Sequence, residues 1–146
     1  MDTFTDLISN RVLISAVVAW FTAQVLKALL TLISTKKFEL ERLFGAGGMP
    51  SAHSASVCAL VIATARTVGA ESPVFALSVI MAVVVMYDAV GVRRAAGRHA
   101  KAIKEVRSRL EINEDKDGKE LKESLGHTPF EVLGGALLGI LIAMIF

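Results

Sequence analysis

Apolar residues in this chain gather into four long blocks separated by polar segments, and these blocks cover residues 12–33, 50–68, 73–92 and 129–146. A helix needs about 20 predominantly apolar residues, with roughly 17–25 tolerated, to cross the hydrocarbon core of a bilayer. A helix of a soluble bundle would instead repeat polar residues along one face, and residues 74–86 contain almost none. The pattern predicts an all-α integral membrane protein, a bundle of four transmembrane helices in one membrane domain over residues 1–146.

The distribution of Lys and Arg predicts which side of the membrane each loop faces, because cytoplasmic loops carry an excess of these residues. Three of them lie between the first two blocks, and ten lie in residues 93–126 between the last two. The opposite side holds only Arg11 and Arg66. We therefore expect both segments to be cytoplasmic. The net charge of the whole chain is only +2, and we expect no nucleic-acid partner.

Residues 93–126 form the long polar segment of the sequence. When its first half is drawn as a helix, basic residues occupy one side. The other side is mostly apolar and carries Ala95, His99, Ala102, Ile103, Val106 and Leu110. This pattern is typical of a helix that lies in the headgroup region of a membrane. It predicts a basic amphipathic cytoplasmic segment between the third and fourth transmembrane helices.

The first apolar block contains one charged residue, Lys27. It lies about seven residues from the cytoplasmic end of the block, or roughly 10 Å at 1.5 Å per residue. Its neighbours at spacings of three and four share its helical face, and they are Trp20, Gln24, Thr31 and Ser34. A charge at this depth either extends to the interface or faces a polar cavity. The stripe favours a cavity, and it leaves a small transporter subunit open as an alternative function.

Two histidines lie beside prolines at the predicted starts of the second and fourth helices. His53 belongs to Pro-Ser-Ala-His at residues 50–53, and His127 belongs to Gly-His-Thr-Pro at residues 126–129. A helix start carries unpaired backbone N–H groups and about half a positive charge, which attract anions. Histidine attacks phosphorus or donates a proton near neutral pH. Two such starts on one side of the membrane predict a phosphate site at the bilayer surface.

Three motifs together resemble those of the type-2 phosphatidic acid phosphatase superfamily, which also includes the vanadium haloperoxidases. The motifs are Gly-Gly-Met-Pro-Ser-Ala-His at residues 47–53, Tyr-Asp-Ala-Val-Gly-Val-Arg-Arg at residues 87–94, and residues 125–131. They are most similar to the small divergent branch of this group. The resemblance implies hydrolysis of a lipid phosphate with no metal ion or other cofactor. It also implies that His127 attacks phosphorus, that Glu131 orients its ring, and that His53 protonates the leaving oxygen.

The resemblance further implies which groups hold the phosphoryl oxygens. They include the Ser51 hydroxyl, the amides around Ala52 and His53, and nearby basic side chains. The candidate basic residues are Arg93, Arg94, Lys27 and Arg42, with Asp88 as a supporting ion-pair partner for the arginines.

The sequence departs from the superfamily pattern at several positions. Ala52 replaces the usual glycine, and Glu131 replaces the usual aspartate. Leu121 stands where the last motif carries an arginine, six residues before its histidine. The first motif, a lysine and an arginine seven residues apart followed by proline, is absent. Arg93, Arg94, Arg42 or Lys27 would have to replace the missing cationic donors.

Simpler roles also account for some of these residues. Thr128 to Glu131 satisfies a capping box, and Arg93 and Arg94 suit charges that set topology. A non-catalytic protein that binds anionic lipid through residues 93–110 is therefore an alternative to a phosphatase in the bilayer with a lipid phosphate substrate. Four helices are fewer than the six of larger relatives, and small residues line faces of the second and fourth helices. These features make a homodimer a further expectation.

Overall fold

The structure, a computed structural model, describes residues 3–36, 48–110 and 125–146, and all regular secondary structure within these ranges is helical. The helices are α1 (Thr3–Ser9), α2 (Arg11–Thr35), α4 (Ala52–Val68), α5 (Pro73–Val90), α6 (Val92–Arg109) and α7 (Pro129–Ile145). Helices therefore form over all four predicted blocks, which confirms the all-α class. The short helix α1 is an addition that the apolar blocks did not predict.

Local sequence explains where the helices begin. The side chains of Ser51, Ser72 and Thr128 accept hydrogen bonds from backbone N–H groups in the first turns of α4, α5 and α7. Such caps satisfy donors that have no partner inside the helix. Pro73 and Pro129 occupy the first helical positions, where the missing N–H of proline costs nothing. The cap at Thr128 is a complete capping box with Glu131.

Two described segments are long and apolar enough to cross a membrane, Arg11–Thr35 and the nearly continuous Pro73–Arg109. Helices α4 and α7 are apolar but shorter, at 17 residues each. A helix of that length extends about 26 Å at 1.5 Å per residue, which is close to the roughly 30 Å thickness of a hydrocarbon core. The structure thus contains two helices of clear spanning length and two near the lower limit.

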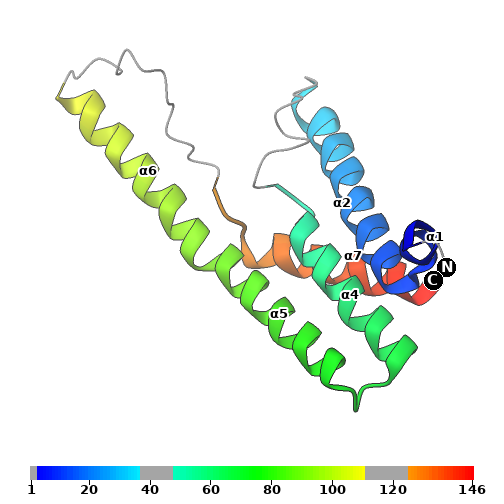
Figure 1. The fold of residues 1–146 in the computed structure, drawn as a ribbon. Helices are drawn as coiled ribbons and strands as arrows, with labels where there is room; N and C mark the ends of the chain where they lie inside the picture. Colours follow the sequence, from blue (N-terminus) through cyan, green and yellow to red (C-terminus); the bar gives the residue numbers. More distant parts are fainter. Residues whose placement is uncertain (1–2, 37–47, 111–124) are drawn as a thin grey trace.

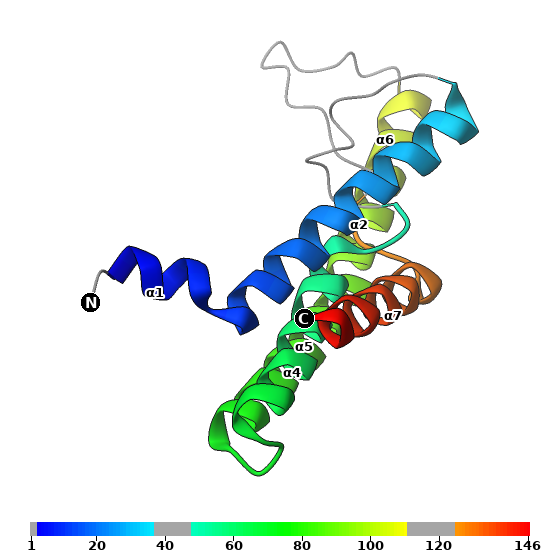
Figure 2. The ribbon, with the colours of Figure 1, turned by 90° about the vertical axis from the view of Figure 1, so that its right-hand side faces the viewer.

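Helix α4 is the central element of the fold. It packs against α7, α2 and α5, and α7 also contacts α2 and α5. Within the described residues α2 and α5 make no contact with each other, so they flank α4 on either side. Figures 1 and 2 show α2 and α5 running on different sides of α4, with α7 running across α4. All residues of α4 from Ser54 to Ala65 are accordingly buried or half-buried.

Small residues allow α4 and α7 to approach closely. A Cβ atom added to Gly135 would lie 2.3 Å from the Ser51 carbonyl oxygen, and one added to Gly139 would lie 2.1 Å from that of Ala55. Both distances are far too short for a side chain, so only glycine fits at either position. The Gly-x-x-x-Gly spacing places both on one face of the helix. The glycines of α7 therefore pack directly on the backbone of α4.

The small-residue face of α4 likewise packs against other helices of the same chain. Ala52, Ala55, Ala59 and Ala63 belong to one buried cluster that also includes Ala19 and Ala23 of α2 and Ala143 of α7. At the far end, an Arg66 Nη1 N–H donates to the Ala143 carbonyl oxygen at 2.6 Å. These faces were one of the two reasons to expect a homodimer, and they are occupied within one chain. The other reason, the small number of helices, is unaffected, so the homodimer stays a prediction.

Helix α6 forms within the predicted amphipathic segment, and its location in the headgroup region stays a prediction. A single residue separates it from α5, and the two helices run along nearly the same line (Figure 1). Gly91 joins them with φ −94° and ψ −88°, outside helical geometry. Apolar residues of α6 such as Ile103, Val106 and Leu110 remain 48–63% exposed. The amphipathic pattern was read correctly as a helix, but periodicity carries no information about the angle between consecutive helices.

Candidate functional site

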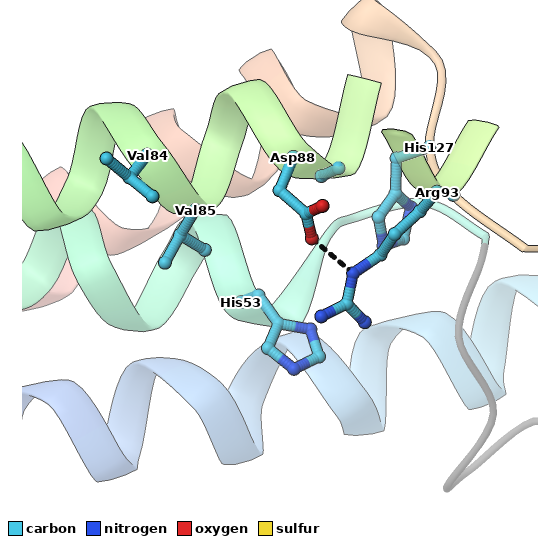
Figure 3. Close-up of a pocket in the computed structure, with 8 residues that line it drawn as sticks. His53, Val84, Val85, Asp88, Arg93 and His127 are labelled. Carbon is cyan, nitrogen blue, oxygen red and sulfur yellow. Dashed lines mark hydrogen bonds and ion pairs between the residues drawn. The ribbon is translucent and has the colours of Figure 1, made fainter. Parts of the chain in front are cut away.

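A pocket of about 220 Å³ lies where α4 and α7 begin and α5 ends. Its lining comes from four separate segments and consists of His53, Val84, Val85, Asp88, Ala89, Arg93, Gly126 and His127. Figure 3 shows His53, Asp88, Arg93 and His127 gathered at one end of the pocket, with the two valines farther along α5. The structure thus brings both predicted histidines to one cavity.

Backbone hydrogen bonds hold the segments of the pocket together. The Ser51 N–H donates to the Glu131 carbonyl oxygen at 3.0 Å, which joins the starts of α4 and α7. The His127 N–H donates to the Ala89 carbonyl oxygen at 3.0 Å, which joins the segment before α7 to α5. These bonds fix the positions of the histidines through the main chain rather than through flexible side chains.

Gly126 brings the loop before α7 against the start of α6. Its φ is +86°, a left-handed conformation that glycine adopts without steric penalty. A Cβ atom at this position would lie 2.3 Å from the Arg94 backbone nitrogen. Glycine is therefore needed twice, for the turn and for the close approach. The result is that His127 enters the pocket beside Arg93.

His127 is 6% exposed and is oriented by Glu131. Its Nδ1 lies 3.1 Å from Glu131 Oε2. A carboxylate only accepts hydrogen bonds, so the proton of the neutral ring is held on Nδ1 and the lone pair lies on Nε2. The same Oε2 accepts from the Thr128 N–H at 2.9 Å. Glu131 thus caps α7 and fixes the His127 tautomer at once.

His53 lies in the second position of α4, and its side chain is exposed. Electrostatic interactions reach it from Arg93, His127 and Lys27. In Figure 3 the guanidinium end of Arg93 points toward the His53 ring. The positive charge of the Arg93 guanidinium beside the imidazole makes this end of the pocket favourable for an anion.

Arg93 reaches the pocket because the helix breaks just before it. Its Nε–H donates to Asp88 Oδ2, and the two side chains are 51% and 36% exposed. In an uninterrupted α-helix, residues five apart point about 140° away from each other. The break at Gly91 rotates the start of α6 so that Arg93 meets Asp88. The ion pair holds the arginine at the rim of the pocket.

The structure places the other predicted phosphate-binding residues outside the pocket lining. Ser51 is fully buried, and its hydroxyl oxygen accepts from the Ser54 N–H and the Ser54 hydroxyl. Ala52 is 4% exposed and belongs to the core. Arg94 is exposed on α6, and Arg42 lies outside the described residues.

Lys27 does not extend toward solvent. It is 3% exposed, and a Cβ atom added to Gly48 would lie 3.2 Å from its Cδ. Its neighbour on the predicted stripe, Gln24, is 8% exposed, and no hydrogen-bond partner for its Oε1 is found in the described part of the chain. The buried position agrees with the expectation that Lys27 faces the interior of the protein and does not extend to the interface.

Sequence reasoning missed the apolar part of the pocket. Val84, Val85 and Ala89 line it from α5, but α5 is apolar on every side, so no pattern marks one face. Gly126 was named as part of the second histidine motif, but no structural role was predicted for it.

Comparison with known protein families gives a match over nearly the whole chain. Residues 8–142 match the family described as the Divergent PAP2 family. This chain belongs to the divergent PAP2 family. The relationship confirms the resemblance that the histidine motifs suggested, and it covers all the helices of the divergent PAP2 fold described above except part of α1 and the end of α7.

One relative of this divergent PAP2 member is 40% identical over 151 aligned positions, which cover 96% of each chain. It is the Bacillus subtilis (strain 168) protein YuiD, described as an uncharacterized membrane protein. That description and the apolar helices of this chain agree with a membrane location. No solved structure matches the chain.

Proposed function

We propose that this divergent PAP2 family member is a membrane-embedded phosphatase that hydrolyses a phosphomonoester or diphosphate of a lipid through a phosphohistidine. The observation that carries the proposal is the meeting of His53, His127 and Arg93 in one pocket, with Glu131 bonded to the Nδ1 of His127. Phosphoryl transfer needs a nucleophile, a proton donor for the leaving oxygen and cationic donors for the phosphoryl oxygens. These three residues provide one of each.

In the first step, Nε2 of His127 attacks phosphorus, and the bond between phosphorus and the ester oxygen breaks. The leaving oxygen takes a proton from the His53 imidazolium. Arg93 and the backbone amides at the start of α4 stabilise the charge on the remaining phosphoryl oxygens. Glu131 stabilises the positive charge that develops on the His127 ring.

In the second step, water attacks the phosphorus of the phosphohistidine. Neutral His53 takes a proton from this water, the phosphorus–nitrogen bond breaks, and the electron pair returns to Nε2 of His127. Inorganic phosphate leaves, and His53 is again protonated. Both histidines return to their starting states, so the cycle consumes only the ester and water.

The proposal includes a topology. We propose that α2, α4, α5 and α7 all cross the bilayer and that the pocket lies near its cytoplasmic surface. The excess of Lys and Arg in residues 93–126 supports this orientation. The substrate headgroup would then be presented from the cytoplasmic leaflet.

Release of inorganic phosphate from a panel of lipid phosphates tests the activity. The panel contains phosphatidate, phosphatidylglycerophosphate and an isoprenoid diphosphate, presented to the purified full chain in nanodiscs. We expect turnover of at least one substrate and inhibition by vanadate, which mimics a phosphoryl group in transit. The absence of phosphate release from every substrate would contradict the proposal.

Arg93 should matter for substrate binding more than neighbouring cations do. Replacing it by alanine removes a charge-assisted hydrogen-bond donor, so kcat/KM should fall about tenfold to a hundredfold. Arg98, which is exposed farther along α6, provides the matched control, and Arg98→Ala should retain wild-type kinetics. Equal losses in both variants would mean that Arg93 acts only through the general basic charge of α6.

Glu131 has two roles that substitution separates. Glu131→Gln removes the charge beside His127, and we expect turnover to fall about tenfold to a hundredfold. Thr128→Ala removes the other half of the capping box and should lower stability by about 1 kcal/mol while leaving kcat near the wild-type value. Phosphate release and thermal unfolding, measured on both variants, distinguish the roles. Normal turnover by Glu131→Gln would mean that Glu131 only caps α7 and does not assist His127.

Helix α6 favours a second candidate function, binding of anionic lipid without catalysis. Its basic residues Arg94, Arg98 and Lys101 are exposed, and an exposed basic helix is attracted to anionic headgroups. Co-sedimentation with phosphatidate vesicles measures this binding directly. Strong binding by a wild-type chain that releases no phosphate would favour this function over the phosphatase.

A further inference from the structure

The pocket has a polar end and an apolar end. Val84 and Val85 lie four residues before Asp88 and Ala89 on α5, which places them about 6 Å farther from α6 along the helix axis. All four residues line the pocket. The histidines and Arg93 form the polar end (Figure 3). A single molecule that fills this pocket therefore meets positive charge at one end and valine side chains at the other.

The apolar end is continuous with the outer surface of the protein. Val84 lines the pocket and is nevertheless 61% exposed. Ile80, one turn farther along the same face of α5, is 62% exposed. Because both side chains are more than half exposed, no other described helix covers this face of α5. The pocket thus opens sideways onto the apolar surface of α5 as well as toward the polar end.

The geometry points to lateral entry of an amphiphilic phosphate ester, with its apolar chain lying against Val84 and Val85. This inference rests on the proposed phosphatase function and adds two residues that determine substrate specificity. A bilayer lipid entering this way keeps its chain in an apolar environment while its phosphoryl group reaches His127. A hydrated small phosphate ester gains nothing from the valines. The positive charge at one end and the apolar wall at the other complement an anionic amphiphile and not a second copy of this apolar surface.

Narrowing the apolar end tests the inference. Val84→Trp and Val85→Trp fill the space where the chain would lie. Val83→Trp is the matched control, because Val83 is 53% exposed on the same helix and does not line the pocket. Each variant is assayed with dioleoyl phosphatidate in nanodiscs and with para-nitrophenyl phosphate in solution.

The two substrates should respond differently. We expect the ratio of kcat/KM for phosphatidate to kcat/KM for the soluble ester to fall about tenfold or more in the Val84 and Val85 variants. The Val83 variant should match the wild type on both. Equal effects on the two substrates, or equal effects of all three substitutions, would overturn the inference and leave the phosphatase function standing.

Photo-crosslinking gives a measurement that does not depend on turnover. A long-chain alkyl phosphate with a diazirine near its head is irradiated with the wild-type chain, and the labelled peptides are mapped. Labelling in α5 around Val84 that decreases in Val84→Trp is the expected result. Labelling confined to other helices would overturn the inference. If phosphate release is absent while α5 is labelled, the proposed catalysis fails and the binding mode survives.

Discussion

The His127→Gln variant should lose phosphate release by about a thousandfold or more, because no other group in the pocket replaces the attacking nitrogen. Glutamine is similar in size to histidine and keeps a polar group beside Glu131, so the buried position is not left empty. The matched control is His99→Gln, since His99 is exposed on α6 and does not line the pocket. His99→Gln should release phosphate at the wild-type rate.

Trapping the covalent intermediate distinguishes the proposed roles of the two histidines. Rapid acid-free quenching of the wild-type chain with radiolabelled para-nitrophenyl phosphate should trap label on His127, and His127→Gln should trap none. His53→Gln should still react with this ester, whose leaving group needs no proton, and should accumulate label because hydrolysis of the intermediate is slowed. Turnover by His127→Gln, or label on another residue, would refute the assigned nucleophile.

The Gly139→Ala variant should be the most destabilised single-methyl variant of the α4–α7 contact. Its Cβ would lie 2.1 Å from the Ala55 carbonyl oxygen, and backbone atoms cannot move aside as a side chain can. Overpacking of this kind typically lowers the free energy of unfolding by about 1–3 kcal/mol. Because the clash is with main chain, we expect a loss at or above the upper end. Thermal unfolding in detergent, followed by circular dichroism, measures it.

Gly134 provides the matched control on the same helix. A Cβ atom there would lie 3.0 Å from Cε of Met49, the flexible end of a long side chain. Alanine is favoured over glycine within helices by about 1 kcal/mol, so Gly134→Ala should be neutral or slightly stabilising. Equal unfolding temperatures for the two variants would show that α4 and α7 do not pack as closely as described.

The sequence was sufficient to predict α2, α4, α5 and α7, because each of these helices is an apolar block between polar segments. Its caps were also readable, since Thr128 and Glu131 stand at the spacing that a capping box requires. Contacts between helices were harder to predict from the sequence. The glycines of α7 indicated close packing but did not name the partner, and the alanines of α4 fitted a dimer as well as an intrachain contact.

The candidate site was predictable where chemistry depends on residue type and less so where it depends on geometry. His53 and His127 stood out because each lies beside a predicted helix start. Ser51 looked like a phosphate ligand, yet its hydroxyl oxygen is engaged in capping α4. Arg93 was indistinguishable from Arg94 in the sequence. Only the rotation of the chain at Gly91 directs one of them to the pocket.

The hydrogen bond from the Ser51 N–H to the Glu131 carbonyl oxygen joins positions 80 residues apart in the chain. During synthesis α4 is made before α7, so the Ser51 N–H gains this acceptor only after 80 further residues have been added. The pocket that contains both histidines therefore depends on a contact between distant parts of the chain and cannot form from α4 and its sequence neighbours alone.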